Sequence, residues 1–106
     1  MTVNILGTEY AVKTVKREDD PKLTDNDGYC DVTTKEIVLC QVEPDKDSVK
    51  DLDRYMNDVL RHEIVHAFLF ESGLQAESFA MDETCVDWIA LQAPKMFNLW
   101  AELGIL

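Results

Sequence analysis

Several features of membrane, secreted and nucleic-acid-binding proteins are missing from this sequence. Its apolar runs are short, as at Ala67–Phe70, whereas a membrane-spanning helix needs about 20 predominantly apolar residues. Residues 1–10 lack a basic segment, a sustained apolar run and a cleavage site, so we expect no signal peptide. These absences favour a cytoplasmic protein without a membrane partner.

Cysteine and basic residues are also scarce. The three cysteines, Cys30, Cys40 and Cys85, are an odd number without CxxC spacing, which argues against a disulfide framework and fits a reducing compartment. Ten basic residues stand against 21 acidic ones, and the formal net charge is -11. This charge repels a phosphate backbone, so we expect no nucleic-acid partner.

The remaining composition is that of an ordinary globular protein. With 106 residues the chain has room for one modest core, so we predict a single domain over residues 1–106. Alternating apolar residues within residues 2–16 predict either a pair of strands or one bent strand, with a turn at Gly7-Thr8. Residues 17–27 are polar and rich in turn signals, which predicts an exposed loop, and their acidic spacing does not match a calcium-binding EF-hand loop.

A hairpin is predicted next, with strands at residues 29–32 and 36–42. The second strand contains the apolar run Ile37–Cys40, so we expect cover on both of its faces. A long helix should begin with Asp47 or Ser48 as N-cap and end near Ser72, because Gly73 can take the left-handed conformation that ends helices. Apolar residues recur at helical spacing along it and predict that it is largely buried; they are Met56, Leu60, Ile64 and Phe68.

The C-terminal third predicts a short link at Leu74–Met81 and further helix. Residues 82–93 have helical spacing, and Pro94 should kink or break the helix before an amphipathic stretch at residues 95–103. We expect the aromatic residues of this region to lie in the core.

Both histidines of the chain lie in one His-Glu-x-x-His motif, formed by His62, Glu63 and His66. On a helix, residues four apart stack on one face, so both imidazoles can bind one divalent metal. Glu63 lies beside them, where it can accept a proton from a water molecule on that metal. The motif therefore predicts a zinc site of the hydrolytic type. The alternative is that the two histidines are ordinary solvated or hydrogen-bonded residues.

A catalytic zinc ion needs a third protein ligand, and the sequence has no third histidine. Glu83 and Asp87 lie four apart on one predicted helical face. We assign Glu83 to the metal and Asp87 to the remaining imidazole N–H of a histidine ligand. Cys85 is the alternative ligand, and it points about 200° away from Glu83 around the helix.

These two motifs, His62-Glu63-x-x-His66 followed by Glu83-x-x-x-Asp87, resemble the gluzincin pattern of metallopeptidases. The short chain is also similar to minimal gluzincins and to small phage- and prophage-encoded proteins related to the ImmA/IrrE metallopeptidases. The resemblance implies an α+β, minimal zincin-like fold: a small, mostly antiparallel sheet packed on a central helix that carries the motif, with a closing C-terminal helix. It also implies Glu63 as the general base, and the host bacterial cytoplasm as the location of a phage-encoded protein.

The predicted function is hydrolysis of peptide bonds in a peptide or protein substrate, with Zn²⁺ as the cofactor. The strand at Glu36–Val42 is the expected sheet edge for pairing with an extended substrate. Two other functions stay open. One is a non-catalytic, phage-type binding module with a structural zinc site that includes Cys85, and the other is a metal-free fold in which the motif is coincidental. The sequence leaves the oligomeric state open.

Overall fold

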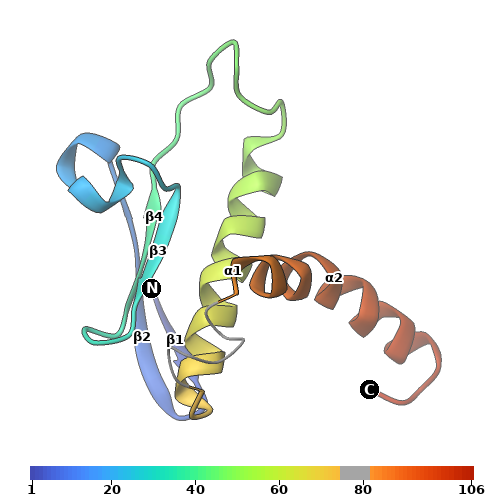
Figure 1. Ribbon diagram of the computed structural model, residues 1–106. Coiled ribbons are helices and arrows are strands. Elements are labelled where there is room, and N and C mark those ends of the chain that lie inside the picture. The colour runs from blue at the N-terminus through green and yellow to red at the C-terminus, as the bar shows by residue number, and fades with distance from the viewer. Residues whose placement is uncertain (75–81) are drawn as a thin grey trace.

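The structure is a computed structural model that describes residues 1–74 and 82–106, and its fold is α+β, as predicted (Figure 1). Helix α1 lies between a small sheet and helix α2. None of the described helices is long and apolar enough to span a membrane. The predicted link at Leu74–Met81 falls, except for Leu74, outside the described residues.

The elements in chain order are β1 (Thr2–Ile5), β2 (Thr8–Val15), the 3₁₀ turns η1 (Arg17–Asp19) and η2 (Pro21–Leu23), β3 (Gly28–Asp31), β4 (Glu36–Cys40), α1 (Leu52–Glu71) and α2 (Glu83–Glu102).

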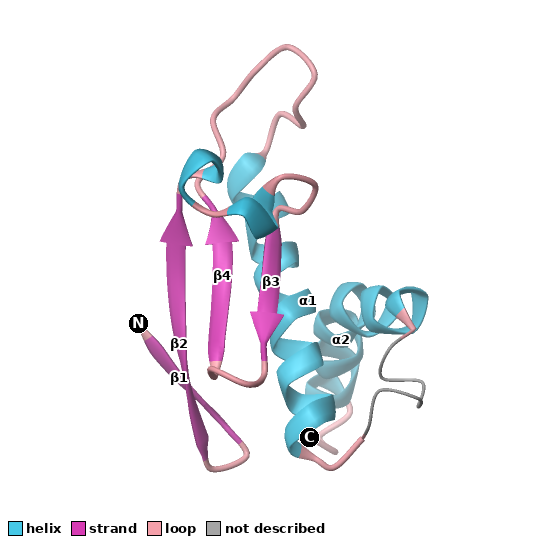
Figure 2. Cartoon of the chain, turned by 60° about the vertical axis from the view of Figure 1, so that its left-hand side comes forward, coloured by secondary structure: helices cyan, strands magenta, loops and turns pink. Residues whose placement is uncertain are grey.

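The four strands form one mixed sheet in the order β1-β2-β4-β3 (Figure 2). The two outer pairs are antiparallel, and β2 and β4 are parallel. The predicted hairpin is therefore confirmed, although its second strand ends at Cys40 rather than Val42. The prediction that this strand is an edge is wrong, because β4 lies between β2 and β3. An almost wholly apolar strand is better placed inside a sheet than at its rim, and β3 becomes the edge instead.

Both faces of β4 are covered, as predicted. Ile37 is fully buried with Tyr10 and Ala67 on the side of α1. Val38 and Cys40 pack on the other side around Leu23, which is also fully buried. The prediction of a wholly exposed loop over residues 17–27 is consequently wrong: η2 brings Leu23 onto the sheet.

The turn of the first hairpin is displaced by one residue from its predicted position. Leu6 and Gly7 form it, with φ angles of 52° and 95°, and Thr8 already pairs with Ile5. A two-residue turn with two positive φ angles matches the twist of the strands it joins, and glycine takes that conformation without steric cost.

Helix α1 begins at Leu52, beyond both predicted caps, Asp47 and Ser48. Its N-cap is Asp51, whose side chain accepts from the Arg54 amide at 3.1 Å. The Ser48 hydroxyl is instead used in a local turn, where it donates to the Asp45 carbonyl at 2.9 Å. At the other end Gly73 has a φ of 98°, which confirms the predicted helix end.

The burial of α1 is lower than predicted. Glu63 and Ala67 are its only buried residues, while Leu60 and Ile64 are half-buried against the sheet. Phe68, expected on the buried stripe, is 42% exposed. The small sheet covers one side of the helix, which explains why one predicted apolar stripe is split between core and surface.

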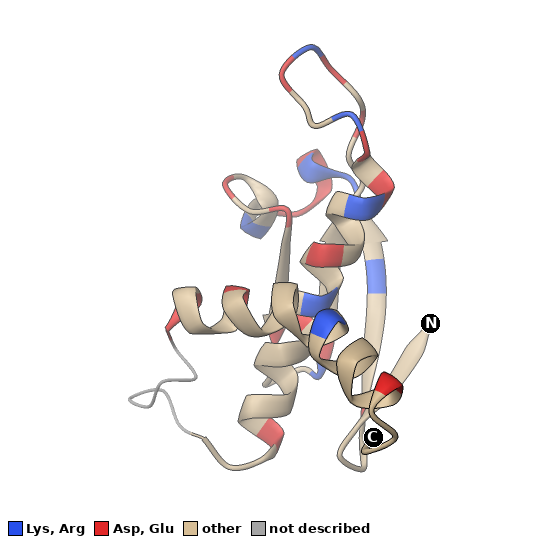
Figure 3. Ribbon diagram, turned by 90° about the vertical axis from the view of Figure 1, so that its right-hand side faces the viewer, with Lys and Arg blue, Asp and Glu red and all other residues tan. Residues whose placement is uncertain are grey.

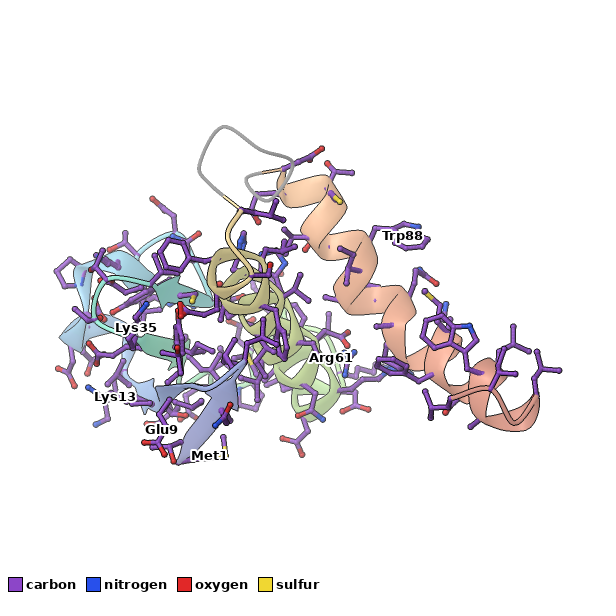
Figure 4. The ribbon with its side chains drawn as sticks, turned by 90° about the horizontal axis from the view of Figure 1, so that it is seen from below. Met1, Glu9, Lys13, Lys35, Arg61 and Trp88 are labelled. Atoms are coloured by element: carbon purple, nitrogen blue, oxygen red, sulfur yellow. The ribbon has the colours of Figure 1, made fainter. Side chains whose placement is uncertain are left out.

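The prediction for Pro94 was a kink or a break, and the break is wrong, because helix α2 continues through this residue. Proline removes one helical bond, from its own nitrogen to the Ala90 carbonyl. Arg61 on α1 replaces that donor, because its Nε donates to the Ala90 oxygen at 3.0 Å. The expected burial of the aromatic residues is also wrong for Trp88, which is 57% exposed (Figure 4), since α2 buries mainly Val86 and Ala90.

Candidate metal and catalytic site

The two motif histidines lie on successive turns of α1. Their Nε2 atoms are 3.2 Å apart, and each side chain is 18% exposed. The four-residue spacing produces this stacking, and the ring planes meet edge to face, with centroids 4.9 Å apart. Both imidazoles therefore direct the same nitrogen toward one point at the surface of the helix.

Glu83 meets this point from α2. It is the first residue of that helix, which Asp82 caps by accepting from the Thr84 amide at 3.0 Å. The Glu83 carboxylate spans both histidines, with Oε2 2.8 Å from His62 Nε2 and Oε1 3.1 Å from His66 Nε2. Glu83 lies 17 positions after His66 in the sequence, and the packing of α2 on α1 brings it to the two histidines.

This cluster has the composition and the size of a metal site. The ligand atoms of His62, His66 and Glu83 all lie within 4.8 Å of one another. Four-coordinate zinc with bonds of about 2.0–2.2 Å separates neighbouring ligand atoms by roughly 3.3–3.6 Å, close to the separations seen here. Two imidazoles and one carboxylate leave a fourth position for water, as in catalytic zinc sites. The three residues can therefore bind a divalent metal.

Asp87 lies behind the cluster, one turn after Glu83. Its Oδ1 is 2.5 Å from Nδ1 of His62. A carboxylate at this nitrogen favours the tautomer that carries the proton on Nδ1, which leaves Nε2 free to bind a metal. Among the described residues the three-ligand group does not include Cys85, the alternative ligand.

Glu63 is the most sheltered charged residue described, with 7% exposure. Burial raises its pKa to about 7; His62 opposes this rise, and the negative charges of Glu83 and Asp87 add to it. A carboxyl group in such surroundings can both take up and give up a proton near neutral pH.

The site opens into a cavity of about 470 Å³ between α1, α2 and the start of β3. Gly28 of β3 lines it together with the four acidic and histidine side chains His62, Glu63, Glu83 and Asp87. A second cavity of about 520 Å³ shares Asp27 and Tyr55 with the first. The two cavities thus adjoin along one side of α1, at the hydrogen bond from Tyr55 to Asp27.

Two features of the site were missed from the sequence. One is Arg61, directly before the motif, which joins α1 to α2 by its hydrogen bond to the Ala90 carbonyl. The sequence does hold a signal for this contact, because Pro94 leaves the carbonyl four residues earlier without its helical donor. Gly28 allows β3 to approach α1, since a Cβ there would lie 2.9 Å from Cγ1 of Val59. A lone glycine at the start of a strand does not reveal which helix passes beside it.

The chain matches a known protein family over most of its length. The protein-family model described as "BSP: Peptidase of plants and bacteria" matches residues 10–104, which include every residue of the site. No curated protein and no solved structure matches the chain.

Proposed function

We propose that this chain, which belongs to the BSP family of peptidases of plants and bacteria, is a zinc-dependent peptidase with a gluzincin-type site. The observation that carries the proposal is the convergence of His62, His66 and Glu83, whose ligand atoms lie within 4.8 Å of one another beside the buried Glu63. In this proposal those three residues are the ligands, and Asp87 orients His62. The site composition is that of His₂Glu metallopeptidases, in which zinc supplies the activated water.

When bound, zinc lowers the pKa of a water molecule and polarises the carbonyl group to be attacked. Glu63 is the general base in this scheme. It accepts a proton from the attacking water and later gives it to the nitrogen of the leaving amine, so that it ends the cycle as it began. Burial raises the pKa of Glu63, which makes its carboxylate a stronger base for the first transfer.

His62 and Asp87 form a positioning pair. The carboxylate of Asp87, 2.5 Å from Nδ1 of His62, fixes the ring orientation and the tautomer that leaves Nε2 free to bind a metal. Glu83 and Asp87 are carried by the same helix, so a movement of α2 would change a ligand and its support together.

The expected substrate is an extended peptide. β3 is an edge strand, and its first residue lines the cavity that contains the site. An extended chain can add to such an edge through backbone hydrogen bonds, which brings a peptide bond beside Glu63 without selecting particular side chains. In this proposal β3 takes the role that the sequence suggested for residues 36–42.

The decisive experiment compares the zinc-loaded protein with Glu63→Gln on a mixed peptide library. Glutamine has nearly the same shape but cannot accept the proton, so we expect retained zinc and loss of cleavage. Cleavage at an unchanged rate in the variant would exclude Glu63 as the base. A wild-type protein that holds zinc tightly but cleaves no peptide would instead support the non-catalytic binding module with a structural zinc.

A further inference from the structure

Helix α2 has an apolar face on the side away from α1. Val86 and Ala90, which are buried toward α1, lie on one side of the helix. On the other side, at 100° per residue, six residues fall within an arc of about 100°. We call them the outer face of α2: Trp88, Ile89, Gln92, Met96, Leu99 and Leu103.

Half of the outer face is open to solvent: Trp88 is 57%, Leu99 52% and Leu103 62% exposed. Ile89, Gln92 and Met96 are half-buried. The side chain of Trp88 extends away from α1 and the sheet in Figure 4. A row of large apolar side chains on a projecting helix is typical of an interaction surface, since isolated exposed residues do not line up at helical spacing.

The distribution of charge favours a second copy of this chain as the partner. The formal net charge of the chain is -11, yet residues 88–106 contain one lysine and one glutamate, so the whole excess lies in residues 1–87. Figure 3 shows most of α2 without charged residues. Two such acidic molecules repel each other over most of their surfaces, and α2 is where they can approach without that repulsion.

The two charges of this segment also match each other. Lys95 and Glu102 are exposed, seven residues apart and therefore on the same side of the helix, along one border of the outer face. When two copies of α2 pack antiparallel around a two-fold axis near Leu99, Lys95 of each copy faces Glu102 of the other. Met96 and Leu103, also seven apart, meet in the same way along the opposite border. Parallel packing would place like charge on like charge.

We propose that the outer face of α2 is the interface of an antiparallel homodimer. The dimer buries the apolar row and forms two reciprocal Lys95–Glu102 pairs. It leaves the face of α2 that carries Glu83 and Asp87 against α1, so each copy keeps its own site.

Sedimentation equilibrium of the full chain with zinc present tests this proposal over about a hundredfold range of concentration. We expect a concentration-dependent dimer. Lys95→Glu or Glu102→Lys alone turns both pairs repulsive and should weaken association about tenfold, while the double exchange Lys95→Glu/Glu102→Lys should restore it. Both side chains are exposed, so these changes do not disturb the core.

A second pair of variants tests the apolar contact. Leu99→Asp puts a charge near the two-fold axis and should abolish the dimer, whereas Val49→Asp adds the same charge at a 53% exposed position outside α2 and should not. A wild-type chain that is monomeric throughout the range overturns the proposal and leaves the face to a different protein. A dimer that is insensitive to Leu99→Asp, or that the double exchange fails to restore, also overturns it.

Discussion

The guanidinium group of Arg61 donates to the carbonyl oxygen of Ala90 at 3.0 Å, at the one position of α2 where Pro94 removes the helical donor. Arg61 precedes the first motif histidine, and Ala90 follows Asp87 by three residues. One hydrogen bond therefore joins the helix of two histidine ligands to the helix of Glu83. Ala90 is 3% exposed, so the bond lies at the buried contact between the helices.

The first prediction is that Arg61 and Pro94 are energetically coupled. Arg61→Met leaves the Ala90 carbonyl without this donor, and we expect a loss of roughly 1–3 kcal/mol in the free energy of unfolding and weaker zinc binding. Pro94→Ala restores a backbone N–H to the helix and should make Arg61→Met less costly. Urea unfolding and zinc titration of the four proteins in this cycle measure the coupling.

Arg61 also forms an ion pair with Asp58, which the same substitution removes. Asp58→Asn is the matched control, because it deletes that pair and keeps the bond to Ala90. We expect it to have a small effect, since the two side chains are still 39% and 32% exposed and ion pairs in contact with water contribute little. Strict additivity of Arg61→Met and Pro94→Ala would contradict the coupling.

The second prediction is that replacing Glu83 lowers the zinc affinity more than replacing Asp87 does. Glu83→Ala removes a ligand and leaves two histidines, so affinity should fall severely; Asp87→Ala removes one hydrogen bond to His62 and should cost about 10- to 100-fold. Competition titrations with a zinc chelator at one pH give the order. Cys85→Ser is the control expected to bind normally. Equal and small losses for both carboxylates would mean that they form a solvated helix face.

The motif residues were predictable because their chemistry depends on spacing within one helix. His62 and His66 meet through the helical repeat alone, and Glu83 with Asp87 shares that repeat on α2. The meeting of the two helices was inferred from the chemistry of zinc, which needs a third ligand. The structure brings Glu83 within 2.8 Å of His62. Whether a metal binds there is a proposal, tested by the titrations above.

The sheet was less predictable because strand order depends on long-range pairing. Periodicity identified the strands but not that β2 would pair in parallel with β4, which moves β4 inside and makes β3 the edge. The start of α1 was misplaced because serine and aspartate both cap helices and build local turns, and Ser48 does the latter. Burial of Trp88 was assumed from its residue type, whereas α2 has few described elements to pack against.

The third prediction tests the close approach of β3 to α1. In Gly28→Ala the new methyl group would lie 2.9 Å from Val59 Cγ1 and 3.2 Å from the Val38 carbonyl oxygen. Overpacking of this kind costs about 1–3 kcal/mol in the free energy of unfolding. Val59→Ala removes the nearer contact, so the double variant should lose less than the sum of the two single changes. Thermal or urea unfolding measures all three, and purely additive losses would show that the strand and the helix adjust independently.

The fourth prediction is a pH dependence carried by Asp27. Its carboxylate accepts from Tyr55 of α1 at 2.5 Å and from Arg17 at 2.6 Å, which ties the segment before β3 to the helix. The hydrogen bond from Tyr55 lowers the pKa of Asp27 below its ordinary value, and the hydrogen bond from Arg17 adds a smaller effect in the same direction. The folded state therefore favours the ionised form more strongly than the unfolded chain does.

The sign of the effect follows from that lowered pKa. The contribution of Asp27 to the free energy of unfolding is complete above the unfolded pKa, about 4, and is lost as the pH falls through the lower folded value. Asp27→Asn should thus destabilise the protein at pH 7, and its difference from wild type should shrink in acid. Asp25→Asn, at an exposed aspartate two residues away, is the control and should leave the profile of wild type unchanged. Urea unfolding from pH 7 to pH 3 measures the three curves. A difference between wild type and Asp27→Asn that stays constant over this range would show that the contacts of Asp27 do not depend on its charge.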